Sequence, residues 1–239
     1  MPMRTTTGKL IGWCARAMGK GLVAAVWRRP GGSRSEAVAY FSVGRTSLDT
    51  QRLRAILPAF GYPPSPVTGI GFGGGGYGRL GRRLVGGAGD GGGASHKRKR
   101  FRTSSGFGGG HMFTGYAAFD GEHWRLYPFV GLGGGGQGFG VRPAKRKPMP
   151  AEHAALPSGG TGGPAMHAGW TTEFRLRLLP LGGLLVGVQL GWDLSPVRLP
   201  WFVRGFGDVR LPLPRAARPY VNLIVGVFVE STQVDQPRQ

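Results

Sequence analysis

The sequence predicts an all-β protein: an antiparallel, up-and-down β-barrel of about eight strands, with one short helix in its first long loop. Apolar residues recur at every second position in several segments of about ten residues. Tight turns and long links alternate between these segments. Glycine accounts for 47 of 239 residues. A tightly curved, closed sheet tolerates this density, because glycine permits coiling and leaves room inside.

The composition limits the classes of function. There are 31 basic residues against 11 acidic ones, a formal charge of +20, which predicts attraction to nucleic acid, anionic lipid or acidic polysaccharide. A hydrophobic content of 40% is too high for a simple disordered tail. The single cysteine, Cys14, excludes an intramolecular disulfide and a multi-cysteine zinc site. No stretch reaches the roughly 18–20 apolar residues of a membrane-spanning helix, which excludes an α-helical membrane protein.

The chain divides into three parts. Residues 1–35 are expected to be a degenerate, signal-like or disordered segment, since the apolar runs Leu10–Cys14 and Gly21–Trp27 are short for a secretory signal. Residues 36–230 form the predicted barrel domain, and residues 231–239 form a polar tail.

The helix is predicted in the first long loop, after a first strand that starts at Glu36, and glycine-rich strands follow it. Residues 47–57 begin with a good N-cap residue, Ser47, carry Asp49 in the first turn and stop before Pro58. Alternation is weak in Val67–Gly78 and Ser104–Phe119, and clear in the first part of Trp124–Gly140.

The last three strands carry the strongest alternation. In the segment Trp170–Leu178, apolar side chains alternate with Glu173, Arg175 and Arg177. In Leu184–Leu194, apolar residues alternate with positions that include glycine, Gln189 and Asp193. Residues 220–230 show the same alternation. Each strand therefore has one apolar face and one face of glycine mixed with polar or charged residues.

The links fix the topology. Tight turns are expected near Leu80–Arg82, at Asp120-Gly121 and at Pro180–Gly183. Long links are expected at the following segments: 47–66, 91–102, 142–165 and 195–218. Counted from Glu36, long and short connections alternate, so four long loops share one end of an eight-stranded meander and three tight turns share the other.

The polarity of the faces favours an inverted, membrane-type barrel. The polar face of the strands carries only a few charged residues, some acidic and some basic. This composition suits a narrow lumen better than a surface facing water. The apolar parity carries aromatic residues near strand ends, where an interfacial girdle would lie: Trp124, Trp170, Trp192 and Tyr220. A soluble barrel with the faces reversed is the alternative.

The segments YPFVGLGGGG, GLLVGVQLGW and PYVNLIVGVFV resemble strands of small eight-stranded outer-membrane β-barrel proteins, in particular uncharacterised glycine-rich bacterial members. The resemblance covers about residues 36–230 and includes no catalytic motif. It implies a location in the bacterial outer membrane, despite the absence of a clean signal peptide, and a structural or binding role in the cell envelope. The polar tail departs from the aromatic residue that closes the last strand in such proteins.

Two groups of residues are candidates for function. The first is a charge network in the lumen, and its expected members are Arg125, Glu173, Arg175, Arg177, Gln189 and Asp193. The second is a pair of basic loops at one rim, expected to bind anionic lipid or lipopolysaccharide phosphates: Lys97, Arg98, Lys99, Arg100, Arg102, Lys145, Arg146 and Lys147. The alternative partner is nucleic acid, bound by a soluble, basic, glycine-rich barrel.

No catalytic, cofactor or metal site is predicted. The segments 71–76 and 131–136 match G-x-G-x-x-G, but no helix follows either, as a dinucleotide site requires. The five histidines show no ligand-pair spacing. Eight strands enclose a lumen that side chains fill, so bulk solute transport is not expected. The sequence identifies neither the ligand nor the oligomeric state.

Overall fold

The computed structural model describes residues 35–48, 50–98, 100–144, 156–195, 202–204 and 217–231. The predicted segments 1–35 and 231–239 lie outside these residues except for Ser35 and Ser231, which are the end residues of β1 and β10. The elements in chain order are β1 (Ser35–Ser47), α2 (Gln51–Ile56), the 3₁₀ turn η1 (Leu57–Phe60), β2 (Thr68–Leu80), β3 (Arg83–Arg98), β4 (Phe101–Tyr116), β5 (Phe119–Asp120), β6 (Trp124–Pro143), β7 (Ser158–Leu179), β8 (Gly182–Leu194), β9 (Phe202–Arg204) and β10 (Ala217–Ser231).

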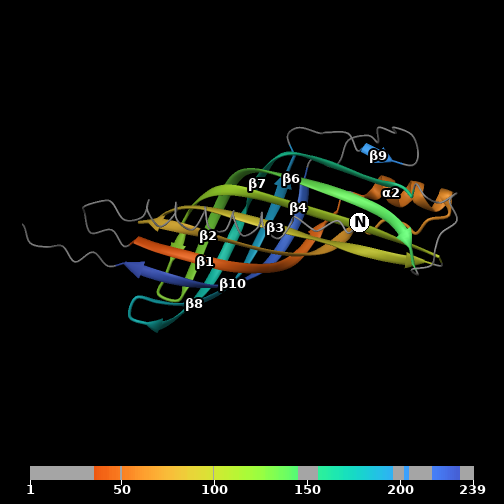
Figure 1. The fold of residues 1–239 in the computed structure, drawn as a ribbon. Coiled ribbons are helices and arrows are strands. Elements are labelled where there is room, and N and C mark those ends of the chain that lie inside the picture. The colour runs from red at the N-terminus through yellow and green to blue at the C-terminus, as the bar shows by residue number, and fades with distance from the viewer. Residues whose placement is uncertain are drawn as a thin grey trace, which may run out of the picture.

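Eight antiparallel strands of the described chain close into a barrel, because β10 pairs with β1 as well as with β8 (Figure 1). Following the paired residues once around the barrel from Glu36 leads to Thr46, ten residues further along β1. The path runs through Arg79, Leu84, Gly115, Phe129, Gly169, Gly191 and Tyr220. This stagger sets the tilt of the strands and leaves an interior that side chains fill. The predicted fold class is confirmed.

The outward face is the apolar one. Phe41, Val130, Trp170 and Leu190 each expose about half of their surface, whereas the opposite parity is buried inside the barrel. Trp124 and Trp192 also point outward, but Tyr220 is buried in the lumen, so its expected place in an outward girdle was wrong. An outward apolar belt around a polar lumen is the arrangement of membrane-spanning barrels, and the reversed alternative does not describe this chain.

Two of the three predicted tight turns lie where they were expected. Gly81 and Arg82 join β2 to β3, with Gly81 at φ 59°, and Pro180 and Leu181 join β7 to β8. The third connection is longer than expected, because β4 ends at Tyr116 and the two-residue strand β5 precedes the turn that contains Gly121.

The long-loop end differs from the prediction in one respect. The segment 91–102 is a strand hairpin, in which β3 and β4 pair as far as Arg98 and Phe101. Likewise, β6 continues to Pro143 and β7 begins at Ser158. These extensions carry glycine and basic residues without apolar alternation, so the period-two signal that marks a strand is missing from them.

The predicted helix exists within the first long loop, but it begins at Gln51 instead of Ser47, with Thr50 as its N-cap. Asp49 lies outside the described residues. Beyond Ile56 the chain continues as η1, which includes Pro58 and ends at Phe60, with Gly61 at φ 77° as its C-cap. Leu53 and Leu57 pack on the inner face of β6, so this segment lies over part of the barrel mouth.

Candidate functional site

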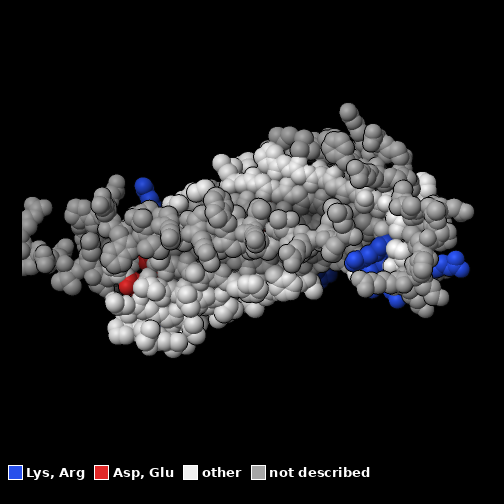
Figure 2. Space-filling model, viewed as in Figure 1, with Lys and Arg blue, Asp and Glu red and all other residues white. Residues whose placement is uncertain are grey.

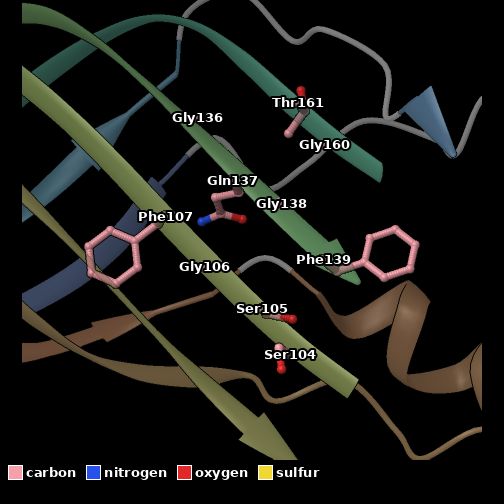
Figure 3. Close-up of a pocket in the computed structure, with 10 residues that line it drawn as sticks. All are labelled: Ser104, Ser105, Gly106, Phe107, Gly136, Gln137, Gly138, Phe139, Gly160 and Thr161. Carbon is pink, nitrogen blue, oxygen red and sulfur yellow. The ribbon is translucent and has the colours of Figure 1, made fainter. Parts of the chain in front are cut away.

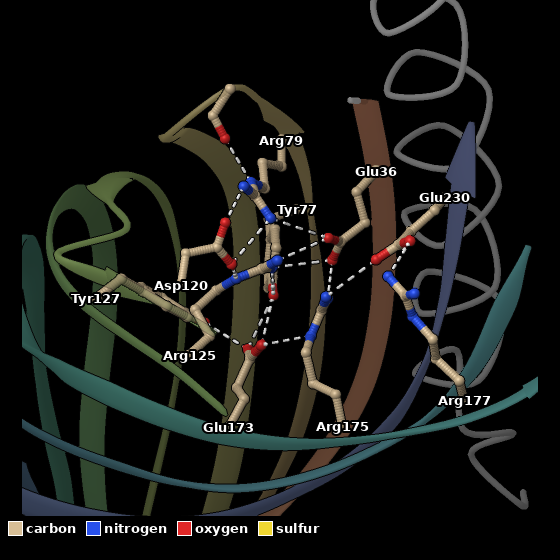
Figure 4. Close-up of polar contacts among 11 residues, drawn as sticks. Glu36, Tyr77, Arg79, Asp120, Arg125, Tyr127, Glu173, Arg175, Arg177 and Glu230 are labelled. Atoms are coloured by element: carbon tan, nitrogen blue, oxygen red, sulfur yellow. Dashed lines mark hydrogen bonds and ion pairs between the residues drawn. The ribbon is translucent and has the colours of Figure 1, made fainter. Parts of the chain in front are cut away.

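A network of ion pairs fills the lumen near the tight turns, with Glu36 of β1 at its centre (Figure 4). The guanidinium of Arg125 donates to both carboxylate oxygens of Glu36, at 3.0 and 2.9 Å. Arg175 donates to the same carboxylate, and Arg79 lies 3.5 Å from it. Glu36 and Arg125 are 2% and 1% exposed. Because strands far apart in sequence contribute these groups, the network holds opposite walls of the barrel together.

A second carboxylate, Glu173, lies deeper in the same network. The hydroxyl of Tyr77 donates to it at 2.7 and 2.9 Å, and the hydroxyl of Tyr127 donates at 2.9 Å. Arg175 is 3.7 Å away. Two phenols and a nearby guanidinium therefore satisfy a carboxylate that is fully buried.

The outer layer of the network faces the turns. Asp120 bonds to Arg79 and to the Nε of Arg125, the latter at 3.0 Å. Burial alone would raise the pKa of the Asp120 carboxyl, but the two guanidinium groups hold it below its ordinary value. Glu230 lies between Arg175 and Arg177, at 3.5 and 2.8 Å. Four arginines thus meet four carboxylates, and the paired side chains obstruct this end of the lumen.

The predicted network residues separate into two groups. Arg125, Glu173 and Arg175 belong to the buried network, and Arg177 reaches its edge with 45% of its side chain exposed. Asp193 does not pair with them, contrary to the expected cross-strand pairing. It lies six residues along β8 from Gly187, the partner of Glu173, which is about 20 Å. The structure adds residues that the sequence did not single out: Glu36, Tyr77, Arg79, Asp120, Tyr127 and Glu230.

Asp193 belongs to a second polar level nearer the barrel mouth. Its carboxylate contacts the Nδ1 of His167 at 2.6 Å and Arg218 at 3.7 Å. The ring of His167 stacks on that of His111. Gln189 lies in this region and accepts a hydrogen bond from Asn222 at 3.3 Å. These residues surround a cavity of about 20 Å³, which has room for a water molecule but not for an organic substrate.

A larger concavity of about 640 Å³ lies on β4, β6 and β7 at the long-loop end (Figure 3). Phe107 and Phe139 contribute aromatic rings, Gln137 lies between them, and glycines of the three strands form much of the lining. Phe139 also packs against Leu53 and Leu57 of the α2–η1 segment.

Basic side chains gather at the same end of the molecule (Figure 2). The strand register places Lys97 of β3 opposite Arg102 of β4, and Arg102 opposite Arg142 of β6. No ion pair joins any of the three to a carboxylate among the described residues. Neighbouring like charges on adjacent strands are destabilising unless an anion accompanies them. We call these three residues the basic row.

The other predicted anion-binding residues lie near the row or outside the described chain. Arg98 and Arg100 lie at the tip of the β3–β4 hairpin and are exposed. Lys99, Lys145, Arg146 and Lys147 fall outside the described residues. Arg142 was not predicted, because only the register of β4 with β6 brings it beside Arg102.

The motif segments and histidines offer no metal or dinucleotide site in the described chain. Residues 71–76 and 131–136 lie inside strands β2 and β6. No group of three or more metal-ligating side chains is found in the described ranges, and His153 lies outside them. No helix in the described part of the chain has the length and apolar character needed to span a bilayer.

No protein-family model matches the sequence, and no curated protein is significantly similar to it. Among solved structures, the chain is similar to Ail, the attachment invasion locus protein of Yersinia pestis, crystallised with the heparin analogue sucrose octasulfate. Identity is 12%, coverage is 84% of this chain and 100% of Ail, and the TM-score is 0.42. Neisserial surface protein A is 11% identical, with coverage of 84% and 99% and a TM-score of 0.37. The outer-membrane protease OmpT of Escherichia coli is 9% identical, with coverage of 85% and 97% and a TM-score of 0.32. The expected barrel architecture rests on the strand pairing of this chain, in which β10 closes the sheet onto β1.

Proposed function

We propose that this chain is a non-enzymatic barrel of the bacterial outer membrane whose basic row binds phosphate groups on the saccharide of lipopolysaccharide. The observation that carries the proposal is the row itself: Lys97, Arg102 and Arg142 lie side by side on three strands, with no carboxylate paired to them in the described chain. An external polyanion supplies the missing charge, and guanidinium groups can form paired hydrogen bonds with phosphate.

The height of the row favours a saccharide over a phospholipid headgroup. Leu132 is the last outward apolar side chain of β6, and glycine occupies the outward positions between it and Arg142. Ten residues of a tilted strand place Arg142 roughly 25 Å above Leu132 along the barrel axis. The headgroup layer of one leaflet is only about 5–8 Å thick.

Two features of the lumen support a role without catalysis or bulk transport. The ion network obstructs the turn end with side chains that are almost fully buried. The His167–Asp193 pair resembles a general base with its orienting carboxylate, but its cavity of about 20 Å³ leaves no space for a substrate.

The test compares the wild type with the triple variant Lys97→Gln, Arg102→Gln, Arg142→Gln, both refolded in detergent micelles. Binding to purified lipopolysaccharide is measured by surface plasmon resonance at several salt concentrations. We expect the variant to lose at least tenfold in affinity and most of the salt dependence. The matched control is Arg82→Gln, Arg83→Gln, which removes exposed charge from the opposite end of the barrel.

Further ligands separate the sources of phosphate. Lipopolysaccharide lacking core phosphates should bind weakly, and phosphatidylglycerol vesicles should not distinguish the triple variant from the wild type. Equal binding of the triple variant and the wild type to lipopolysaccharide would refute the proposal. Tighter binding of the row to single-stranded RNA than to lipopolysaccharide would favour the nucleic-acid alternative.

A further inference from the structure

Two histidines from strands that are not neighbours meet inside the barrel. His111 of β4 and His167 of β7 stack with ring centroids 3.9 Å apart and planes inclined by 18°. Strand β6 runs between them, and its inward residues at this level are Gly131 and Gly133. A Cβ atom on Gly131 would lie 3.2 Å from Cδ2 of His111. The two glycines therefore leave the space in which the imidazoles reach each other.

One of the two rings is oriented by a carboxylate. Nδ1 of His167 lies 2.6 Å from Asp193, which also contacts Arg218. A carboxylate accepts hydrogen bonds, so Nδ1 is the protonated nitrogen of a neutral His167, and Nε2 carries the lone pair. The side chain of His167 is 8% exposed. Protonation at Nε2 would create an imidazolium that Asp193 stabilises directly.

Several other buried polar atoms of this level have no hydrogen-bond partner in the described chain. Nε2 of His167, both ring nitrogens of His111 and the hydroxyls of Tyr40 and Tyr220 are buried without a hydrogen bond in the described chain. They adjoin the cavity of about 20 Å³. Buried polar groups without partners are costly, so binding of a water molecule or a proton here would lower that cost.

The charged side chains around the histidine pair have a net charge of −1 when both carboxylates are ionised. Asp90 of β3 and Asp193 of β8 contribute two negative charges, and Arg218 of β10 contributes one positive charge. Strand β1 presents Tyr40 and β10 presents Tyr220, whereas β2 and β6 present glycine, such as Gly73 opposite Asp90. With both imidazoles neutral, the local charge is −1.

We propose that the His111–His167 pair is a site for a single proton inside the barrel. The first proton binds to His167, where Asp193 stabilises the cation and the local charge becomes zero. A second proton on His111 would place two cationic rings 3.9 Å apart, so it binds only at lower pH and separates the rings. This site lies above the ion network and shares no residue with the basic row.

The experiment is an NMR titration of protein refolded in micelles with ¹³C-labelled histidine, with each signal assigned from single His→Asn variants. We expect the two signals to change in two separate steps, because two cationic rings in stacking contact repel each other. In Asp193→Asn the first proton should bind about tenfold or more weakly, because the carboxylate in contact with the ring is lost. In His167→Asn the midpoint of His111 should rise, because a like charge is removed.

Two controls keep the result interpretable. His123→Asn removes an exposed histidine near the tight turns and should leave both midpoints unchanged. Heat-modifiable gel mobility reports whether each variant has folded. If a variant does not fold, the wild-type titration still decides the question. One shared midpoint for the two histidines would overturn the proposal, as would a His111 midpoint that is indifferent to His167→Asn.

Discussion

Replacing Arg125 by methionine is expected to lower the free energy of unfolding by about 3 kcal/mol. The substitution keeps most of the side-chain volume but removes two hydrogen bonds to Glu36, one to Asp120 and one to Tyr77. Breaking a buried ion pair by removing one partner costs about 3–5 kcal/mol. Glu36 keeps its contact with Arg175, so the lower end of that range applies.

The assay is equilibrium urea unfolding in lipid vesicles, followed by the fluorescence of the six tryptophans. The comparison variant is Arg177→Gln, whose half-exposed side chain makes one ion pair with Glu230 and should cost less than about 1 kcal/mol. The double variant Glu36→Gln, Arg125→Met should cost less than the sum of its single changes, because the second change no longer strands a buried charge. Equal losses for Arg125→Met and Arg177→Gln would refute the reasoning.

Three further predictions concern single positions. The lowered pKa of Asp120, held down by Arg125 and Arg79 against the effect of burial, stabilises the folded state above the ordinary value of 3.8 and ceases to do so as the pH falls through the folded value. Urea midpoints of the wild type and Asp120→Asn should therefore differ at neutral pH and converge in strong acid. Gly133→Ala should abolish the heat-modifiable band, because its Cβ would overlap a carbonyl oxygen of β4. Gly140→Ala should leave the band unchanged, since its Cβ would meet only one atom, at 4.0 Å. Gly81→Ala should lower the free energy of unfolding by about 1–2 kcal/mol, because φ is 59° there; an unchanged urea midpoint would contradict this.

The parity of the strands could be predicted from the sequence, because alternation is a local property of the chain. Leu190 and Gln189 are adjacent residues, and β8 places one outward and one inward. Local pattern also located the turn at Gly81 and the inward placement of Glu173. The apolar face was predicted to point outward because the polar face carries few charges. The exposed leucine and valine side chains confirm this prediction.

Pairing between strands could not be predicted in the same way. Glu36 and Arg125 are 89 residues apart, and their contact follows from the stagger accumulated around the whole barrel. Shifting one pairing by two residues would preserve every inward and outward assignment and yet move Glu36 away from its partners. For the same reason Asp193 was assigned to the wrong level, and Arg142 was not recognised as a neighbour of Arg102.

The inward glycines explain how two polar levels fit within one narrow lumen. A Cβ on Gly169 would lie 2.9 Å from Cζ of Phe129, and one on Gly86 would lie 2.8 Å from Cζ of Phe113. Each glycine thus accommodates the ring of a neighbouring strand, and the rings of Phe113 and Phe129 pack edge to face at 5.8 Å. These rings belong to the apolar cluster of the lumen, and they lie between the ion network and the histidine pair. Because these rings separate the histidine pair from the ion network, protonation of the pair should leave the ion pairs of Glu36 intact.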